Sequence, residues 1–239
     1  MKSDPLSWLV SLEGVPSAFA SARDGVDVLL RDRGLRRTSP ELTAESLLRG
    51  AHASAVLEGS GSTFDDVRDG AGDEVAMDAV RLSTELLGLA PLLARAPLQA
   101  LARMHAVVAG GLPESSRGRP RDAESAARLR DIAQVLSAPT DAPALLVAAL
   151  VHAELATAAP FPSHNGVVAR ALERLVIVAR GVDEKSLVVP EAAHLELRPA
   201  YEGRLRGYAA DGAAGVHAWL LYAAEAIGVA TEASPLRRS

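Results

Sequence analysis

The chain has 239 residues, of which 49% are hydrophobic, and its formal net charge is −5 at pH 7. This acidic balance excludes the strongly basic surface typical of proteins that bind nucleic acid or anionic membranes. The absence of cysteine excludes disulfides and cysteine-based metal sites. The first residues show no signal-peptide pattern, so we expect a cytoplasmic protein with neither nucleic acid nor membrane as partner.

Helix signals and turns alternate in the first half of the chain. Thr38 and Ser39 offer hydroxyl caps and Pro40 follows in the first turn, so these residues predict a helix start. A stretch rich in Gly and Ser ends that helix, and Thr63 then fits the N-cap of a short one. Apolar spacing and these breaks predict helices at 16–33, 41–57, 73–89, 98–108 and 122–136.

Two helices in the second half are apolar on nearly every side, one opening at Pro143 and the other at His164 or Asn165. A helix without a polar face is a buried helix, so this pair is the predicted centre of the core. Further helices are expected at 199–209 and 216–227, and only 186–189 is locally strand-like. The predicted organisation is one all-α domain at 40–230, with an N-terminal helical extension at 1–39 and a tail at 231–239.

A short loop rich in Pro, Ser, His, Asn and Gly connects the two buried helices. A loop that opens onto a helix N-terminus presents unpaired backbone N–H groups, and the helix field there favours an anion by roughly 0.3–1 kcal/mol. Gly166 permits close approach of a ligand to the backbone, and Arg170 follows one turn into the helix. The sequence therefore predicts an anion site at this loop.

The loop resembles the motif of the Fic (Fido) family, His-Pro-Phe-x-Asp/Glu-Gly-Asn-Gly-Arg-x-x-Arg, which lies between two central helices. The residues that match are Pro160, Phe161, Asn165, Gly166 and Arg170. The departures are Ala159 for the family His, Ser163 for the acid, His164 for a Gly and Val167 for the first Arg. The match is thus partial, and its gaps fall on the residues that carry chemistry in that family.

A second stretch is similar to the inhibitory helix of many Fic proteins, whose pattern is Ser/Thr-x-x-x-Glu-Gly/Asn. Here Ser54, Glu58 and Gly59 supply that pattern about a hundred residues upstream of the loop. With this second match the resemblance covers roughly 40–225 and implies a Fic-like all-α fold. It also implies that Glu58 pairs with Arg170, at a cost for Glu58→Ala of about 3–5 kcal/mol if the pair is fully buried.

The resemblance also implies that three catalytic residues of the family are missing from this sequence. In the family the His is the general base that lets a target hydroxyl attack the α-phosphate of ATP, and an alanine cannot accept a proton. Removing a general base costs about 10²–10⁴-fold in rate. The acid holds Mg²⁺ and the first Arg contacts phosphate, and neither Ser163 nor Val167 replaces them well.

The function predicted from this resemblance is a non-AMPylating pseudoenzyme or regulatory protein. It retains nucleotide or phosphate binding through Phe161, Asn165, Gly166 and Arg170. ATP or another nucleotide is the expected ligand, and Mg²⁺ is not favoured. Two alternatives stay open: an active transferase of AMP or another phosphate-containing group that uses His164 as its base, or a structural domain that binds a protein partner. The sequence specifies neither the partner nor the oligomeric state.

Simpler readings compete at several positions. Arg170 can pair with Glu173 on its own helix, and the Asn165-Gly166 pair can be only a helix cap and turn. His164 can be a capping residue, while His152 is expected to be a hydrogen-bonded core histidine.

Other polar residues favour no site. Arg117, Arg119 and Arg121 lie where the family places a substrate-aligning flap, although a solvated loop is the default interpretation. The remaining histidines show no metal-ligand spacing, so no metal site is predicted. No Ser–His–acid set is indicated either, because the sequence assigns no geometry to the adjacent Ser163 and His164.

Overall fold

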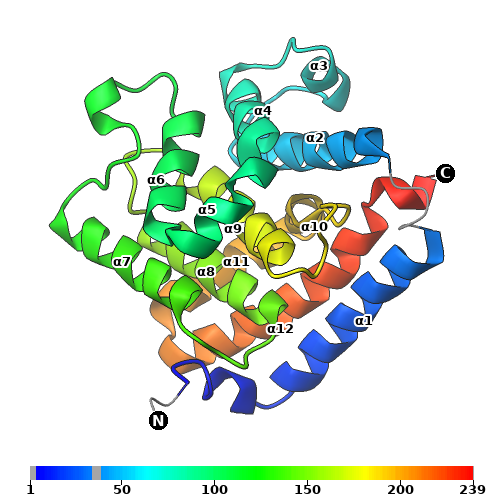
Figure 1. Ribbon diagram of the computed structural model, residues 1–239, viewed down its shortest axis with the longest axis vertical. Helices are drawn as coiled ribbons and strands as arrows, with labels where there is room; N and C mark the ends of the chain where they lie inside the picture. The colour runs from blue at the N-terminus through cyan, green and yellow to red at the C-terminus, as the bar shows by residue number, and fades with distance from the viewer. Residues whose placement is uncertain (1–3, 34–38, 239) are drawn as a thin grey trace.

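The computed structural model describes residues 4–33 and 39–238, and this part of the chain is helical without any strand (Figure 1). The α-helices are α1 (Val15–Arg33), α2 (Pro40–Leu57), α3 (Phe64–Arg68), α4 (Glu74–Leu86), α5 (Ala90–Arg95), α6 (Pro97–Val108), α7 (Ala123–Ser137), α8 (Ala144–Ala158), α9 (Asn165–Ala179), α10 (Pro190–Glu196), α11 (Arg198–Ala210) and α12 (Gly212–Glu232). Short 3-10 turns occur at η1 (Leu9–Ser11), η2 (Leu87–Leu89), η3 (Glu114–Ser116) and η4 (Pro235–Arg238). The all-α prediction is confirmed.

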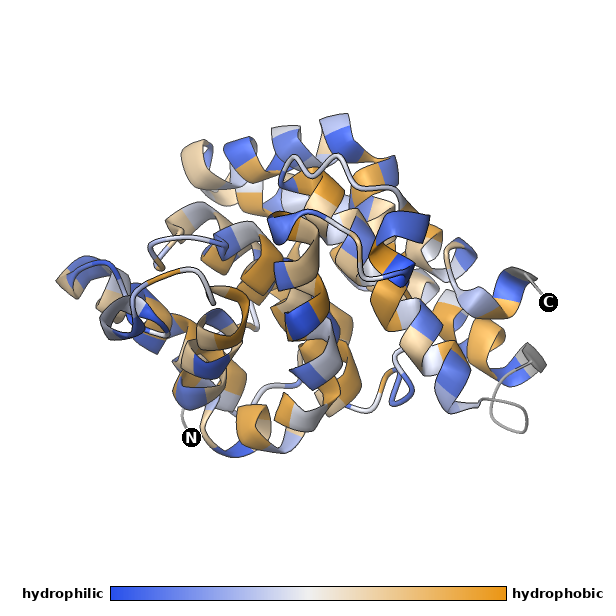
Figure 2. Ribbon diagram, turned by 90° about the horizontal axis from the view of Figure 1, so that it is seen from above, coloured by the Kyte–Doolittle hydropathy of each residue, from blue (hydrophilic) through white to orange (hydrophobic). Residues whose placement is uncertain are grey.

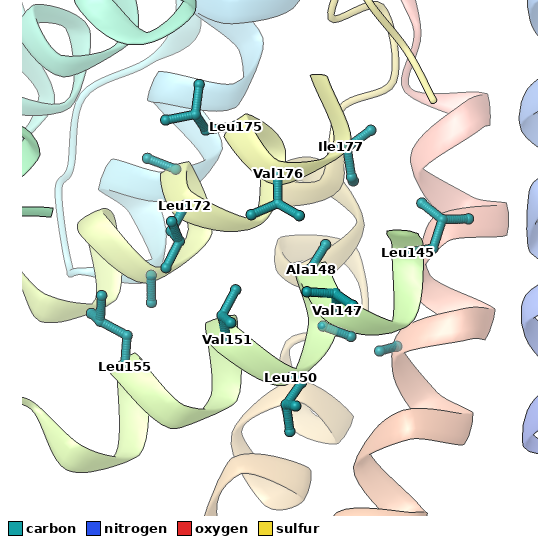
Figure 3. Packing of buried hydrophobic residues seen from close by; sticks show 14 of the residues in the cluster. Leu145, Val147, Ala148, Leu150, Val151, Leu155, Leu172, Leu175, Val176 and Ile177 are labelled. Carbon is teal, nitrogen blue, oxygen red and sulfur yellow. The ribbon is translucent and has the colours of Figure 1, made fainter. Parts of the chain in front are cut away.

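The two apolar helices form the centre of the molecule, as predicted. Helix α8 packs against α7, α9, α11 and α12, so it is covered on every side and has no need of a polar face. Figure 3 shows Val151 and Ala148 of α8 facing Leu172 and Val176 of α9. The loop between α8 and α9 therefore starts and ends on two rigid, buried elements.

The remaining helices surround this pair with their apolar sides turned inward. Hydrophobic and hydrophilic segments alternate along most of them, as expected for amphipathic helices (Figure 2). The structure differs from the sequence prediction in two places. Helix α5 was not expected because six residues are too short to show a periodic pattern. The strand-like stretch 186–189 is a loop, in which the Asp183 carboxylate accepts hydrogen bonds from the N–H groups of Leu187 and Val188.

Helix starts depend on local side chains in several places. Thr63 is an N-cap, because its hydroxyl accepts a hydrogen bond from the Asp66 N–H while the Asp66 carboxylate accepts one from the Thr63 N–H. This reciprocal capping box satisfies two N–H groups that the helix cannot bond internally. Ser39 occupies the N-cap of α2, but its side chain makes no capping hydrogen bond. Thr38 lies outside the described residues.

Helix α12 is long and apolar enough to cross a membrane by length and composition, with a mean hydropathy of 1.3, yet 50% of that window is buried. It packs against α1, α8, α10 and α11, and a core helix passes the same test. This is weak support for a membrane span, and cytoplasmic localisation stays a prediction. Helix α1 lies along α12 and η4 contacts α2 (Figure 1). The domain limits proposed at 39/40 and 230/231 also stay predictions.

Candidate functional site

The loop between α8 and α9 is shaped by its backbone. Ala159 and His164 have φ values of 42° and 56°, in the left-handed region that residues with side chains rarely adopt. The Asn165 side chain closes the loop, since its Oδ1 accepts the Phe161 N–H at 2.9 Å and its Nδ2 donates to the Phe161 carbonyl at 2.8 Å. Asn165 therefore holds the loop backbone through its side chain, whereas the N-cap position belongs to His164, which makes no side-chain cap.

Arg170 and Glu58 form the predicted ion pair. The Arg170 Nη2 lies 2.7 Å from the Glu58 Oε1, and the arginine side chain is 2% exposed. Arg170 also donates to the Ser54 hydroxyl at 2.9 Å, to the Ser54 carbonyl at 3.1 Å and to the Tyr201 hydroxyl at 3.2 Å. The Glu58 side chain is 34% exposed, so the larger cost expected for a fully buried pair does not apply.

The position of Glu58 at the C-terminal end of α2 brings it to Arg170 and the start of α9. Glu58 is the C-cap of α2, and Gly59 with φ 94° turns the chain away directly after it. A carboxylate at a helix C-terminus is electrostatically unfavourable, but here it faces the start of another helix. The N–H groups of Asn165, Gly166 and Val167 donate no hydrogen bond within the described part of the chain. The field at the start of α9 therefore favours the negative charge.

Gly166 makes the close contact possible. A Cβ placed on Gly166 would collide with the Glu58 Oε1 and lie 3.1 Å from the Arg170 Nη1. The Glu58 carboxylate thus lies against the bare backbone at the N-terminus of α9, beside a guanidinium. An internal carboxylate occupies the position for which the sequence predicted an external anion.

His164 is held by two polar neighbours. Its Nε2 lies 3.0 Å from the Asp78 Oδ2 on α4, and its Nδ1 lies 2.6 Å from the Ser163 hydroxyl. Burial lowers the pKa of His164, while the charges of Glu58 and Glu74 act in the opposite direction. Asp78 is buried and also forms an ion pair with Arg81. Sequence reasoning missed Asp78, although a carboxylate on the apolar face of α4, one turn before Leu82, was a detectable signal.

The residues that differ from the Fic motif do not form a hard-cation site. Ala159 and Val167 carry no ligand atom, and Val167 is buried. The Ser163 hydroxyl is engaged with His164, and the neighbouring carboxylates of Glu58 and Asp78 are paired with Arg170 and with His164 and Arg81. Mg²⁺ prefers several free oxygen ligands in octahedral geometry. This donor set does not fit Mg²⁺.

The loop before α7 packs on the motif loop. The Arg121 N–H donates to the Pro160 carbonyl at 3.0 Å, and the His105 Nδ1 accepts the Gly118 N–H at 2.9 Å. The His105 ring stacks on Phe161 with 4.3 Å between ring centroids. Phe161 is therefore a core residue, with 1% of its surface exposed.

The three arginines of this loop do not act together. Arg117 donates to the carbonyls of Gly110 and Leu112, Arg121 approaches the Ala158 carbonyl at 3.4 Å, and Arg119 is exposed. This arrangement agrees better with a solvated loop than with a cluster of arginines around an anion.

A buried hydrogen-bond network extends from Arg170 into the core. The His152 Nδ1 lies 2.6 Å from the Glu173 Oε2, and the His152 Nε2 lies 3.0 Å from the Tyr201 hydroxyl that Arg170 contacts. The predicted core role of His152 is confirmed, and the alternative Arg170–Glu173 pair is wrong because Glu173 bonds His152 and His194 instead. Burial alone would raise the pKa of Glu173, but these two histidines hold it well below its usual range.

The same network brings together the ligand atoms of a metal site. Those of His152, Glu173 and His194 lie within 4.8 Å of one another. A carboxylate only accepts, so His152 donates its Nδ1 proton to Glu173. The second His194 nitrogen lies 2.9 Å from the Tyr222 hydroxyl. Hydrogen bonds join these atoms into a polar network in the core. The three residues lie too far apart in sequence to show a metal-ligand spacing.

Comparisons with known proteins agree with this architecture. No family model matches the sequence, and no curated protein matches it. Among solved structures, a Fic family protein from Desulfovibrio desulfuricans G20 superposes with a TM-score of 0.73 at 17% identity, over 90% of this chain and 73% of that one. The chain has a Fic fold.

Two further structures support the Fic fold. A variant of Fic-1 from C. elegans superposes with a TM-score of 0.73 at 18% identity, over 96% of this chain and 73% of that one. A Fic domain containing signaling protein from Bacteroides thetaiotaomicron VPI-5482 gives 0.64 at 14% identity, over 90% of this chain and 97% of that one. At such identities the likeness concerns the fold, and the roles of individual residues follow from the geometry above.

Proposed function

We propose that this Fic-fold protein is a regulatory protein that binds a phosphate-bearing ligand, such as a nucleotide, at the start of α9. Glu58 competes with the ligand for Arg170. The protein does not transfer AMP by the chemistry of the Fic family, since no base stands at Ala159 and no hard-cation ligand at Ser163.

The observation that carries the proposal is the position of the Glu58 carboxylate. It lies against the Gly166 backbone and 2.7 Å from the Arg170 Nη2, where three N–H groups begin α9. A phosphate oxygen has the same charge sign and the same acceptor chemistry as this carboxylate. The competitor also stands at the edge of the site, because the Glu58 side chain is 34% exposed at the C-cap of α2.

The energy of the internal pair sets how strongly Glu58 competes. Because Glu58 is 34% exposed, its charged hydrogen bond to Arg170 contributes about 1–2 kcal/mol. Since 1.4 kcal/mol corresponds to a tenfold change in affinity, removal of Glu58 should tighten ligand binding by about 5–30-fold. Arg170 would keep its contacts with Ser54 and Tyr201, so it stays in place for the ligand.

Calorimetric titration with ATP tests the proposal on the wild type, Glu58→Gly and Glu58→Gln. We expect weak or undetectable binding to the wild type and about 5–30-fold tighter binding to Glu58→Gly, with the isosteric Gln variant between them. Gly166→Ala in the Glu58→Gly background is the matched control, since it keeps every charge but blocks close approach to the backbone. Absence of binding to Glu58→Gly would overturn the proposal and favour a structural domain that binds a protein partner.

Incubation with labelled ATP and cell lysate tests the absence of AMP transfer. We expect no label on any protein from either the wild type or Glu58→Gly. Label transfer that disappears in His164→Ala would support the alternative of an active transferase with His164 as its base.

A further inference from the structure

Ser163, His164 and Asp78 form a connected set of a hydroxyl, an imidazole and a buried carboxylate. The Ser163 hydroxyl lies 2.6 Å from the His164 Nδ1, and the His164 Nε2 lies 3.0 Å from the Asp78 Oδ2. A hydroxyl next to a base that a third group orients is the arrangement that activates a nucleophile. None of these three side chains binds the anion in the proposed function, although both sites lie at the start of α9.

Hydrogen-bond chemistry assigns the protons in this set. An ionised carboxylate can only accept, so the His164 Nε2 carries the proton that faces Asp78. The Nδ1 then has a free lone pair and accepts the Ser163 hydroxyl proton. Burial lowers the pKa of His164, which keeps the ring neutral and able to act as a base near pH 7.

The backbone around Ser163 offers donors for a developing negative charge. Two residues after Ser163, α9 begins with the N–H groups of Asn165, Gly166 and Val167, which donate no hydrogen bond within the described residues. The Glu58 carboxylate lies against this backbone, so it must move before an oxyanion can use these donors. His164 has φ 56°, so the chain turns sharply between the hydroxyl and these donors. Backbone donors beside a nucleophile stabilise the oxyanion of acyl transfer without a cation. Phosphoryl transfer is less suited to this site, because it relies on cations that the donor set here does not hold.

We infer that Ser163 is the nucleophile of an acyl-transfer site for carboxylic esters, with His164 as its base and Asp78 as the residue that positions His164. The Ser163 oxygen bonds the ester carbon while its proton passes to the His164 Nδ1. The carbon–oxygen bond to the alcohol then breaks, and the alcohol leaves with that proton. Water attacks the acyl-serine by the same route and releases the carboxylic acid. This activity goes beyond the proposed ligand binding and does not depend on it.

Labelling with a fluorophosphonate probe tests the nucleophile in the full chain. The serine oxygen would bond phosphorus, fluoride would leave, and the proton would pass to His164. We expect peptide mass spectrometry to place the label on Ser163, with a rate about 10²–10⁴-fold lower in His164→Ala. The matched control is Ser137→Ala, which removes an exposed hydroxyl that donates to the Ala133 carbonyl and should leave the labelling unchanged.

The positioning role of Asp78 needs its own readout. Asp78→Asn should slow labelling by at least about tenfold and shift its pH profile, because the amide no longer fixes the proton on Nε2. Arg81→Gln removes the other partner of Asp78 and should retain labelling, and thermal melts of both variants check that they are folded. Acetylation of Ser163 by p-nitrophenyl acetate tests the acyl intermediate.

Label on serines other than Ser163, or labelling indifferent to His164→Ala, would overturn the inference. Labelling by the fluorophosphonate without an acyl-serine would overturn the choice of carboxylic esters. These outcomes are independent of ATP titration, so the acyl site and the ligand site can fail separately.

Discussion

The Glu58–Arg170 pair allows a quantitative prediction for Glu58→Ala. The substitution removes one charge-assisted hydrogen bond, but Arg170 keeps three others, to the Ser54 hydroxyl and carbonyl and to the Tyr201 hydroxyl. Glu58 is 34% exposed, so water screens its charge and reaches the arginine once the carboxylate is gone. We therefore expect a loss of about 1–2 kcal/mol, below the value for a fully buried pair.

Urea denaturation of the wild type, Glu58→Ala and Glu58→Gln measures this loss. A loss of 1 kcal/mol lowers the melting temperature of a chain of this size by about 2–4 °C, so a thermal melt of Glu58→Ala should show a fall of roughly 2–8 °C. Millimolar ATP should restore about 2–3 kcal/mol to the variant if the ligand exceeds its dissociation constant a hundredfold, and much less to the wild type. A loss above about 4 kcal/mol would refute the reasoning, because it would mean that Arg170 is left as an uncompensated buried charge.

Three further predictions concern the buried histidines, the N-cap of α3 and the contact between Gly166 and Glu58. Burial lowers the pKa of His105 and His152 from 6.5 to about 4, so the unfolded chain takes up protons first as the pH falls. Stability should decline between pH 6.5 and 4, by about 1–2 kcal/mol per histidine at pH 5, and less steeply in His152→Gln, as measured by urea denaturation. Thr63→Ala breaks a capping box and should cost about 1 kcal/mol in the same assay; no loss would argue against the cap. Gly166→Ala should destabilise the wild type more than it destabilises Glu58→Ala, because only the wild type has the Glu58 carboxylate in the path of the new Cβ. Additive effects in this double-mutant cycle would contradict the contact with Glu58.

Sequence patterns predicted those helices whose signals lie within the helix itself. Runs without a polar face placed α8 and α9 at the centre, and Thr63 marked the start of α3 through its own cap. Helix α5 was missed because six residues show no period. Helix α12 extends at both ends of the predicted 216–227, into stretches where Gly212, Gly215 and Gly228 weaken the helix signal.

The site was predicted only where a pattern joined two distant segments. Ser54 and Glu58 matched a known spacing, so the contact of Glu58 with Arg170 could be stated in advance, whereas the hydrogen bonds of Ser54 to Arg170 were not predicted. Asp78 matched no motif, and its contact with His164 depends on how α4 packs on α9. The same holds for the Glu173 network, since no local rule relates residues that meet only in the core.

The motif loop owes its shape to main-chain geometry more than to the side chains that vary. Its two left-handed residues, Ala159 and His164, enclose a segment that the Asn165 amide closes through the Phe161 backbone. None of these constraints requires a histidine base, an acid or a second arginine. A loop built in this way can exchange its other side chains and keep its backbone conformation. A histidine introduced at Ala159 or an acid introduced at Ser163 would therefore stand on a loop whose backbone shape is already fixed.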